Sequence, residues 1–371
     1  MKIFRFFFCV IVFFLILLSV FTSDFKSKVS EREKRKLAPF PELKSEGKLN
    51  KNFFNEMNLY LEDRIGLKFQ YKKLHEKLND VYQVENDADK SGFIGKDGWL
   101  FANGDRLLEN WQKTNRYTEE ELSYYCSKIK NMKSWCEKRG IKFIFYVAPN
   151  KYEIYGEFYP FQPRPQGETL CEQIVSRLKN EGVDVIYPRD FLLEKKRTEP
   201  FPIYYERDTH WNKLGAYYGS LSIVSRIKDF FPGCALPSIS YDFEKCDVPN
   251  GDLEPLIGTS SRLMTDYKVR ATVDGKELTG LFQQENPQND PKFFATRADE
   301  RFPRLVMFRD SFGNSLYPYL APYFSRGEYW WRFPAESDKP YLRSFKPDLV
   351  IFEVVERHMQ YVYTLTEFSD D

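Results

Sequence analysis

Two short segments of the chain contain the residue types needed for catalysis by a nucleophilic serine. Residues 208–212 read Asp-Thr-His-Trp-Asn, and residues 308–314 read Phe-Arg-Asp-Ser-Phe-Gly-Asn. A serine hydroxyl attacks a carbonyl carbon poorly until a base takes its proton, and an imidazole base needs an acid to fix its tautomer. The chain has only 3 histidines, and one of them, His210, follows Asp208 by two residues. We therefore take Ser311 as the candidate nucleophile, His210 as its base and Asp208 as the acid that orients the base.

Each of these residues also has an ordinary structural explanation. Ser311 fits the N-cap of a helix, a position that serine often occupies. His210 fits a histidine at a helix entry that bonds to the local backbone, and Asp208 fits an N-cap. The combination of all three favours catalysis, although no single one of them does. Beside the serine, Asp310 is expected to accept hydrogen bonds from loop amides and to hold the turn.

The elements around the two segments alternate between helix and strand. Apolar residues recur at helical spacing or form short continuous runs. We expect helices over 118–138, 168–180 and 213–230, and strands over 142–147, 183–187, 305–308 and 348–355. This alternation predicts an α/β fold, a three-layer sheet with helices on both faces. In such sheets ligands lie beyond the carboxyl ends of the strands, where Ser311 would begin a short helix whose free N–H groups favour a developing oxyanion.

The remaining segments divide the chain into three parts. We predict a transmembrane helix over 1–22, a stalk and juxtamembrane helical region over 23–85, and a catalytic domain over 86–371. Apolar spacing predicts a helix over 51–80 in the juxtamembrane region. Within the domain, 92–101 predicts a β-hairpin with a Lys-Asp-Gly turn, and the polar, turn-rich stretch 235–300 predicts a small, mostly β insertion.

The predicted membrane anchor rests on an apolar run from Phe6 to Phe21 after a short basic start. The run is near the lower length limit of a membrane-spanning helix and longer than most signal-peptide cores. No small-x-small cleavage site follows it, so we favour an uncleaved signal anchor over a removed signal peptide. Basic residues lie on both sides of the run, and those between 26 and 36 by themselves favour a cytoplasmic domain. Long domains can nevertheless translocate past such charge.

Composition and cysteine spacing argue against several classes of function. The net charge is +1 and the folded part has no basic tract with interleaved aromatics, so nucleic acid is not an expected partner. No Cys-x-x-Cys or Cys/His cluster suggests a metal. Cys126 and Cys136 lie ten residues apart on one predicted helix, too far to bridge, whereas Cys234 and Cys246 flank a proline-containing loop and could pair. Aromatic residues make up 17% of the chain, which suits both a large core and the binding of sugar rings.

Further motifs accompany the two catalytic segments. They are Gly-Lys-Asp-Gly-Trp-Leu-Phe at 95–101, Ala-Pro-Asn-Lys at 148–151 with Ile-Tyr at 154–155, and Pro-Asp at 347–348 leading to Glu-Arg at 356–357. Together with Asp-Thr-His-Trp-Asn and Asp-Ser-Phe-Gly, these motifs resemble the alginate O-acetyltransferase-like proteins of the SGNH hydrolase superfamily. The resemblance spans residues 30–360 or so. The acid–histidine block also precedes the serine, which is this family's permuted order.

The resemblance implies a fold, a reaction and a location. It implies an SGNH hydrolase-like sheet, an acyl intermediate on Ser311, and transfer of acetyl to hydroxyls of an exopolysaccharide or cell-wall glycan without a cofactor. Such proteins commonly work outside the cytoplasmic membrane with a multi-spanning acyl-exporting partner, so we expect a single-pass membrane protein with a periplasmic or extracellular catalytic domain. The chain departs from the superfamily pattern at Arg309, where glycine is usual. The Ser311 amide, Arg309, Asn150 and Lys151 are the candidates for oxyanion or substrate contact.

Two other functions stay open on the sequence alone. The same Ser–His–Asp set could let water take the acyl group, which would make the protein a carbohydrate acetylesterase. The choice between water and sugar depends on how well water is excluded around the serine. The third function is a non-catalytic scaffold of a glycan-secretion complex, and the intact triad argues against it.

Overall fold

A computed structural model describes two units of the chain. The described residues are 13–14, 18–19, 21–27, 29–30, 35–45, 48–50, 52–67, 70, 92–161, 164–273, 276–277, 283–285, 293–365 and 368. One unit comprises Met1–Val84 and the other Glu85–Asp371. Both candidate catalytic segments belong to the second unit.

The first unit includes a helix and two short ribbons. Helix α2 is Phe53–Arg64, and the ribbons pair β1 (Val29–Ser30) with β2 (Arg35–Lys36) and β3 (Lys44–Ser45) with β4 (Lys48–Leu49). The helix predicted over 51–80 is therefore interrupted after Arg64. The chain becomes extended at Ile65, and Leu67 has a φ of 61°, a left-handed conformation that a right-handed helix does not contain. Most of the predicted helix beyond Leu67 lies outside the described residues.

The predicted membrane anchor over 1–22 also lies largely outside the described residues. The structure describes only 13–14, 18–19 and 21–22 of that stretch. Within the parts of the chain that are described, no helix combines the length and the apolar character needed to cross a membrane. The anchor stays a prediction from the sequence.

The second unit is built on a seven-stranded mixed sheet with the order β12-β13-β15-β14-β16-β7-β8. Its strands are β7 (Lys142–Ala148), β8 (Val185–Ile186), β12 (Gln283–Glu285), β13 (Phe293–Arg297), β14 (Arg304–Arg309), β15 (Arg326–Trp331) and β16 (Leu349–Val355). Strands β15, β14, β16, β7 and β8 are parallel, and β13 and β12 add an antiparallel edge. The four strands predicted from the sequence are confirmed as β7, β8, β14 and β16, although β8 is shorter than predicted.

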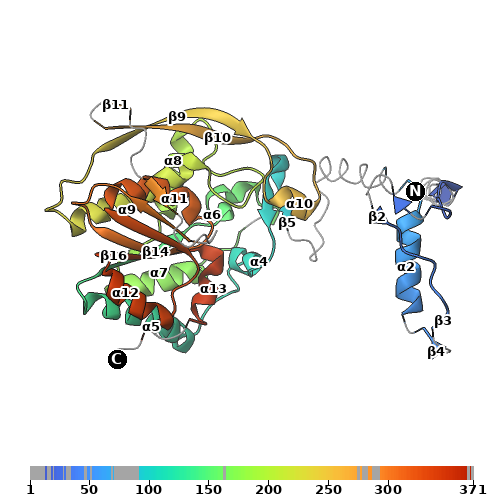
Figure 1. Cartoon of the computed structure of the whole chain (residues 1–371), viewed down its shortest axis with the longest axis horizontal. Coiled ribbons are helices and arrows are strands. Elements are labelled where there is room, and N and C mark those ends of the chain that lie inside the picture. Colours follow the sequence, from blue (N-terminus) through green and yellow to red (C-terminus); the bar gives the residue numbers. More distant parts are fainter. Residues whose placement is uncertain are drawn as a thin grey trace. The chain divides into compact units, whose positions relative to one another are not determined.

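Helices cover both faces of this sheet (Figure 1). One face packs against α6 (Lys151–Tyr155), α8 (Arg189–Thr198), α9 (Lys213–Phe230) and α11 (Gly313–Leu320), and the other against α5 (Glu119–Glu137), α7 (Leu170–Asn180), α12 (Lys339–Phe345) and α13 (Met359–Val362). Side chains alternate between the two resulting cores. In β14, Leu305 and Met307 enter the first core, while Val306 and Phe308 enter the second. The three-layer α/β fold predicted from the sequence is confirmed.

Local sequence signals explain where these helices begin and end. Thr118 caps α5 by accepting a hydrogen bond from the amide of Glu121, whose side chain accepts in return from the Thr118 amide. Helix α7 begins with a second complete capping box. Asn212 caps α9 by accepting from the amide of Gly215 at 3.1 Å. After α5 the chain reverses at Gly140, which has a φ of 74°. The three helices predicted from the sequence are confirmed, with small changes at their ends.

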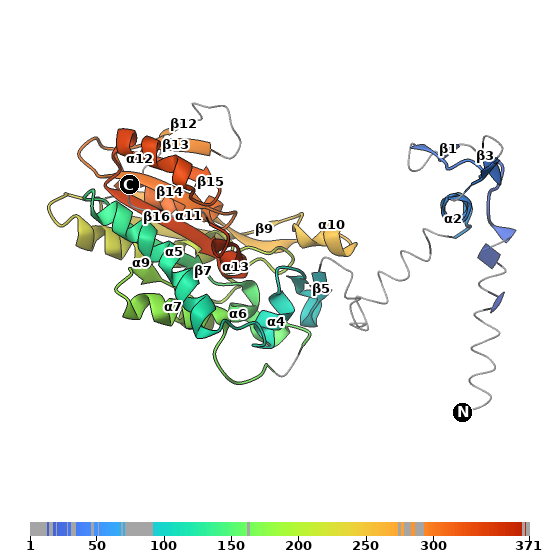
Figure 2. The same cartoon turned by 90° about the horizontal axis from the view of Figure 1, so that it is seen from below.

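The stretch predicted as an insertion, 235–300, is only partly separate from the main sheet. Strands β9 (Ile239–Val248) and β10 (Met264–Val273) form a long antiparallel hairpin that β11 (Lys276–Glu277) extends. Between them, α10 (Leu253–Ile257) lies beside β5 (Figure 2). Strands β12 and β13, however, belong to the main sheet, and here the prediction is wrong. Their short, polar sequences do not reveal the partner strand, because an edge pairing is decided by tertiary contact.

The predicted hairpin at 92–101 is confirmed as β5 (Gly92–Ile94) and β6 (Leu100–Ala102), with its turn at Lys96–Gly98. Both Asp97 and Gly98 have positive φ values, 55° and 79°, and glycine adopts that conformation without steric cost. After the turn, Trp99 stacks on Tyr155 and Phe158 with ring centroids 4.5 and 4.8 Å apart. The hairpin and the following α4 (Leu107–Trp111) thus pack on the helices at the carboxyl end of β7.

Candidate active site

Ser311, His210 and Asp208 form one hydrogen-bonded chain. His210 Nε2 lies 2.7 Å from Ser311 Oγ, and His210 Nδ1 lies 2.7 Å from Asp208 Oδ1. The side chains of His210 and Asp208 are 23% and 16% exposed, so the site is close to solvent. These are the contacts that a serine nucleophile, a general base and an orienting acid require.

The carboxylate of Asp208 is held by three donors. The ring Nδ1 and the amide of His210 donate to Oδ1, and the amide of Asp252 donates to Oδ2 at 3.0 Å. Burial alone raises the pKa of Asp208, but the hydrogen bonds from His210 and Asp252 outweigh burial and lower the pKa to about 2. An ionised Asp208 holds the imidazole proton on Nδ1. The lone pair of His210 Nε2 is then directed at the serine hydroxyl.

Ser311 lies on the turn between β14 and α11. Next to it, Asp310 Oδ1 accepts a hydrogen bond from the amide of Phe312 at 2.9 Å. The other oxygen, Asp310 Oδ2, accepts from the amide of Val355 at 2.7 Å. These bonds tie the turn to itself and to the end of the adjacent strand β16. The serine is therefore presented from a rigid strand-to-helix junction.

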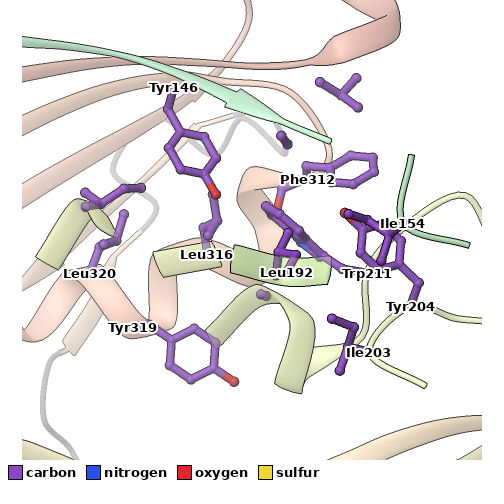
Figure 3. Packing of buried hydrophobic residues seen from close by; sticks show 14 of the residues in the cluster. Tyr146, Ile154, Leu192, Ile203, Tyr204, Trp211, Phe312, Leu316, Tyr319 and Leu320 are labelled. Carbon is purple, nitrogen blue, oxygen red and sulfur yellow. The ribbon is translucent and has the colours of Figure 1, made fainter. Parts of the chain in front are cut away.

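His210 is positioned by the residues that enter α9. Trp211 is fully buried, forms an isolated bridge with Tyr204, and donates from its indole nitrogen to the carbonyl of Phe312 at 3.2 Å. Figure 3 shows Trp211 and Phe312 beside each other, with ring centroids 5.0 Å apart. The His210 ring lies 4.9 Å from the same phenylalanine. The residue after His210 is thus bonded to the residue after Ser311, which fixes the two candidate catalytic segments relative to each other.

Lys151, expected as an oxyanion or substrate contact, is buried against the acid–histidine loop. Its ammonium group donates to the carbonyl of Asp208 at 2.6 Å and to those of Tyr205 and Glu206 at 3.3 Å each. Burial lowers the pKa of Lys151 to about 7, although the Asp208 carboxylate opposes this shift. Because these three carbonyls match the three N–H donors of the ammonium group, Lys151 holds the backbone that carries Asp208 in place.

The side chains of Asn150 and Arg309 lie at the carboxyl ends of β7 and β14. Asn150 is 2% exposed and donates from its side chain to the hydroxyl of Tyr152 at 3.2 Å. Arg309 is 1% exposed and donates to the carbonyl of Asp310 at 3.1 Å. A Cβ added at Gly313 would lie 2.7 Å from Arg309 Cδ, so α11 packs closely on this arginine because position 313 has no side chain. Arg309 therefore supports the serine turn from inside, and Asn150 lies on the same sheet edge as Ser311.

A small hollow of about 20 Å³, room for about one water molecule, opens beside the acid–histidine loop. It is lined by Phe101, Ala102, Leu107, Asn150, Lys151, Tyr152, Thr209 and Arg357. Because Thr209 stands between Asp208 and His210 in the chain, the hollow adjoins the triad directly.

A second histidine lies close to the serine turn. His358 Nδ1 is 3.2 Å from Asp310 Oδ2, and its Nε2 is 3.5 Å from Asp105 Oδ2. Burial lowers the pKa of His358, but the hydrogen bonds with Asp105 and Asp310 outweigh burial and raise it. Beside them, the amide of Asp310 donates to the fully buried Glu353 at 2.9 Å, and burial together with the Asp310 charge raises the pKa of Glu353 well above its usual range. The two ring nitrogens of His358 therefore both face carboxylates, those of Asp310 and Asp105.

Sequence reasoning missed Asp252, which reaches the triad from the long β9–β10 connection. Its carboxylate accepts from the amide and the hydroxyl of Thr209 at 2.8 and 2.6 Å, and its Oδ2 lies 3.6 Å from His210 Nδ1. The preceding Gly251 lies so close to the carbonyl of Arg207 that an added Cβ would be 2.1 Å away. The Asn-Gly-Asp sequence at 250–252 is a turn signal. Nothing local, however, indicates that this turn meets the histidine.

The ligand atoms of Asp208, His210 and Asp252 lie within 4.8 Å of one another, an arrangement that could hold a metal ion. The oxygens of both carboxylates already accept hydrogen bonds from protein donors, namely the amides of His210 and Asp252 and the amide and hydroxyl of Thr209. The hydrogen-bond network accounts for this cluster without a metal.

The cysteines of the described residues are free. Cys126 and Cys136 are buried in α5 and unbridged, as their spacing predicts. Cys246 lies on β9 opposite Asp266, and the pairing with Cys234 that the sequence left open is not formed.

A three-layer α/β fold carries a Ser–His–Asp chain at the carboxyl end of its sheet, an arrangement that suits acyl chemistry. The sequence matches the family described as "SGNH hydrolase-like domain, acetyltransferase AlgX" over residues 93–290, more than half of the chain. The chain therefore belongs to this family of SGNH hydrolase-like acetyltransferases. No curated protein sequence matches it.

Several solved structures resemble the chain. Bacillus cereus PatB1 with a sulfonyl adduct has a TM-score of 0.51 and 14% identity, covering 74% of this chain and 97% of its own. The O-acetyltransferase domain of Pseudomonas putida AlgJ has a TM-score of 0.49 and 16% identity, covering 73% and 92%. Pseudomonas aeruginosa AlgX has a TM-score of 0.48 and 13% identity, covering 76% and 65%. At such identity the likeness to PatB1 concerns the fold alone.

Proposed function

We propose that this protein is an O-acetyltransferase that carries acetyl on Ser311 and passes it to a hydroxyl of an exopolysaccharide or cell-wall glycan. The observation that carries the proposal is the pair of 2.7 Å contacts that run from Ser311 through His210 to Asp208. Membership of an acetyltransferase family supports acetyl as the acyl group. The reaction then has two halves that use the same three residues.

In the first half, Ser311 Oγ attacks the carbonyl carbon of an acetyl donor while His210 Nε2 takes the hydroxyl proton. The carbonyl π electrons move to oxygen and form a tetrahedral oxyanion. When this oxyanion collapses, the bond to the leaving group breaks, and the imidazolium returns the proton to that group. Asp208 keeps the ring oriented and stabilises its charge throughout. The product is an acetyl ester on Ser311.

In the second half, a sugar hydroxyl takes the place of the leaving group. His210 Nε2 removes its proton as the sugar oxygen attacks the ester carbon, and a second oxyanion forms. Collapse of this oxyanion breaks the bond to Ser311 Oγ, which regains the proton from His210. The acetyl group ends on the sugar and the enzyme is restored.

The developing oxyanion needs donors that are already in place. The amide of Ser311, at the turn before α11, is the first candidate, and the side chain of Asn150 at the end of β7 is the second. The contacts of Arg309 and Lys151 with backbone carbonyls favour supporting roles for these two residues. Asp310 supports the turn from which Ser311 projects.

Hydrolysis is the second candidate function, in which water replaces the sugar and the protein acts as a carbohydrate acetylesterase. The partial exposure of the His210 side chain, 23%, favours this possibility because water has access to the base. The two functions share every step up to the acetyl ester on Ser311. They differ only in which hydroxyl His210 activates afterwards.

We also propose that the second unit works outside the cytoplasm. The apolar segment within residues 1–22 would anchor it to the membrane, and a multi-spanning membrane protein would deliver the acyl group. The apolar run in the sequence and the family resemblance support this location. A reporter that is active only outside the cytoplasm, fused after residue 45, tests it. An inactive reporter would overturn the proposed topology.

The reaction is tested by incubating the protein with an activated acetyl ester, with and without an oligosaccharide. Acetylated oligosaccharide is expected for a transferase, and free acetate alone for an esterase. Mass spectrometry of the trapped protein should find a 42 Da adduct on Ser311. If Ser311→Ala leaves both turnover and acyl labelling unchanged, the acyl-serine mechanism is wrong.

A further inference from the structure

An exposed tryptophan lies at the same edge of the sheet as the candidate nucleophile. Trp331 is the last residue of β15 and is 41% exposed, whereas Tyr329 and Trp330 before it are 0% and 7% exposed. In the parallel ladder with β14, Trp331 is the partner of Arg309, two residues before Ser311. Adjacent strands are about 5 Å apart, so the backbone of Trp331 borders the strand end that leads to the serine.

The tryptophan also belongs to the face of the sheet that carries α11. Side chains alternate along a strand, and Tyr329 packs in the core under α9 and α11 while Trp330 packs in the opposite core. Trp331 therefore projects on the side of Tyr329, the side on which α11 begins after Ser311. Its indole faces the side chain of Arg309, the residue whose backbone leads into the serine turn.

One side of the indole rests against a buried arginine. The guanidinium carbon of the buried Arg309 lies 5.4 Å from its ring centroid, a cation–π contact that supports one side of the ring. Directly after it, the amide of Arg332 donates to the carbonyl of Trp330 at 2.8 Å, so the chain turns sharply at this point. A large aromatic surface is thus fixed at the edge and left open to solvent.

Single exposed apolar residues are common on protein surfaces and need no function by themselves. Trp331 differs from such residues in three respects: its neighbour in the ladder leads to the nucleophile, a buried cation supports its ring, and it lies on the carboxyl edge where α/β sheets bind ligands. These features suit a flat ligand that must come close to an acetyl ester on Ser311.

We propose that Trp331 is the platform on which a pyranose ring of the acceptor glycan stacks while one of its hydroxyls faces the acetyl ester. This inference rests on the proposed function and adds the acceptor subsite to it. One face of a pyranose ring presents C–H groups, which pack on the apolar face of an indole. The hydroxyls project from the rim of the ring and stay available to His210 and the ester. The subsite selects for a ring, and it contributes nothing to the first half-reaction.

Steady-state kinetics separate the two halves. With an activated acetyl ester and a β-linked tetrasaccharide, we expect Trp331→Ala to raise the KM for the saccharide by about tenfold. The rate at which Ser311 is acetylated without saccharide should stay within twofold of the wild type. Trp331→Phe should recover most of the lost affinity because it restores an aromatic face. Tyr124→Ala, which removes another aromatic residue of 41% exposure from α5, should change neither quantity.

Two kinetic results would overturn the proposal that Trp331 binds the acceptor. An unchanged saccharide KM in Trp331→Ala means that the indole does not contact the acceptor. An equal loss of Ser311 acetylation in that variant means that the residue acts through the fold. Absence of acetylation in the wild-type protein would instead contradict the proposed function.

Direct binding tests the platform even if that chemistry fails. The full chain with Ser311→Ala is titrated calorimetrically with cellotetraose, chitotetraose and a uronate tetrasaccharide. At least one is expected to bind, and adding Trp331→Ala should weaken that binding by about tenfold. Failure of all three to bind, or equal binding by both proteins, would overturn the proposal.

Discussion

The two histidines next to the serine turn differ in what their second ring nitrogen faces. His210 has Asp208 at Nδ1 and the Ser311 hydroxyl at Nε2, each at 2.7 Å. His358 has carboxylates on both sides, Asp310 at 3.2 Å and Asp105 at 3.5 Å. Both networks are partly buried and both reach the loop between β14 and α11. Only the first ends on a serine hydroxyl.

This difference distinguishes the imidazole that we propose as the base from one that faces carboxylates on both sides. A ring with one carboxylate partner keeps its proton on that side and leaves the other nitrogen as an acceptor. A ring between two carboxylates is stabilised with both nitrogens protonated, and the raised pKa of His358 agrees with this. A doubly protonated ring has no lone pair with which to take a proton from a hydroxyl. The geometry of the partners, more than the residue type, therefore assigns the roles.

The largest effect should come from removing the first imidazole. We expect His210→Ala to lower kcat/KM for an activated acetyl ester by about 10⁴-fold or more, because Ser311 then has no base. The matched variant His358→Gln should lose less than tenfold, since it leaves the base in place. Comparable losses of kcat/KM in His210→Ala and His358→Gln would contradict the assignment of His210 as the base.

Replacement of the acid should have the next largest effect. In Asp208→Asn the ionised acceptor is lost, so the imidazole can adopt the wrong tautomer, and we expect kcat to fall by about 10³-fold. Asp105→Asn alters one of the two acids that face His358 and should lower kcat less than tenfold. The same ester assay measures both. A larger loss in Asp105→Asn would contradict the assignment of the triad.

A smaller effect is expected for Asp252, the second carboxylate near His210. Asp252→Asn removes a negative charge 3.6 Å from His210 Nδ1 but can retain a hydrogen bond to Thr209. We expect about a tenfold fall in kcat with little change in KM, because the charge stabilises the imidazolium that forms in the transition state. Asp247→Asn, an exposed acid on β9, is the control. An equal kcat for the two variants would mean that the charge of Asp252 does not contribute to the reaction.

The smallest effect concerns stability and its dependence on pH. The folded-state pKa of His358 is raised, so its ion-pair stabilisation is fully present below the unfolded value of about 6.5 and is lost as pH rises through the folded value. We therefore expect His358→Gln to lower Tm more at pH 5.5 than at pH 8.5. Thermal unfolding followed by circular dichroism measures the difference in Tm between the wild type and His358→Gln at each pH. A difference that stays constant or grows as pH rises would mean that the charge on His358 does not stabilise the fold.

Much of the architecture could be predicted because its signals are local. The capping box at Thr118 and the N-cap at Asn212 depend on residues within three positions of each other. The short apolar runs that became β7, β14 and β16 are continuous in the sequence. By contrast, β15 was not predicted, since its sequence places the fully buried Glu328 among aromatic residues, where Tyr341 and Arg326 bond to it. Helix α2 ends at Arg64, inside the helix predicted over 51–80, for a conformational reason that periodicity does not show.

Residue types and their spacing determined on their own that the chain has an α/β core and a serine, a histidine and an acid suited to acyl chemistry. Tertiary structure alone decided that His210 reaches Ser311 while His358 pairs with carboxylates, that Asp252 joins the triad, and that Trp331 borders the strand that carries the nucleophile. The physical reason is the separation along the chain between the residues that interact. Caps and apolar runs depend on near neighbours, whereas contacts between distant residues depend on strand order and register, which the burial of the whole sheet selects.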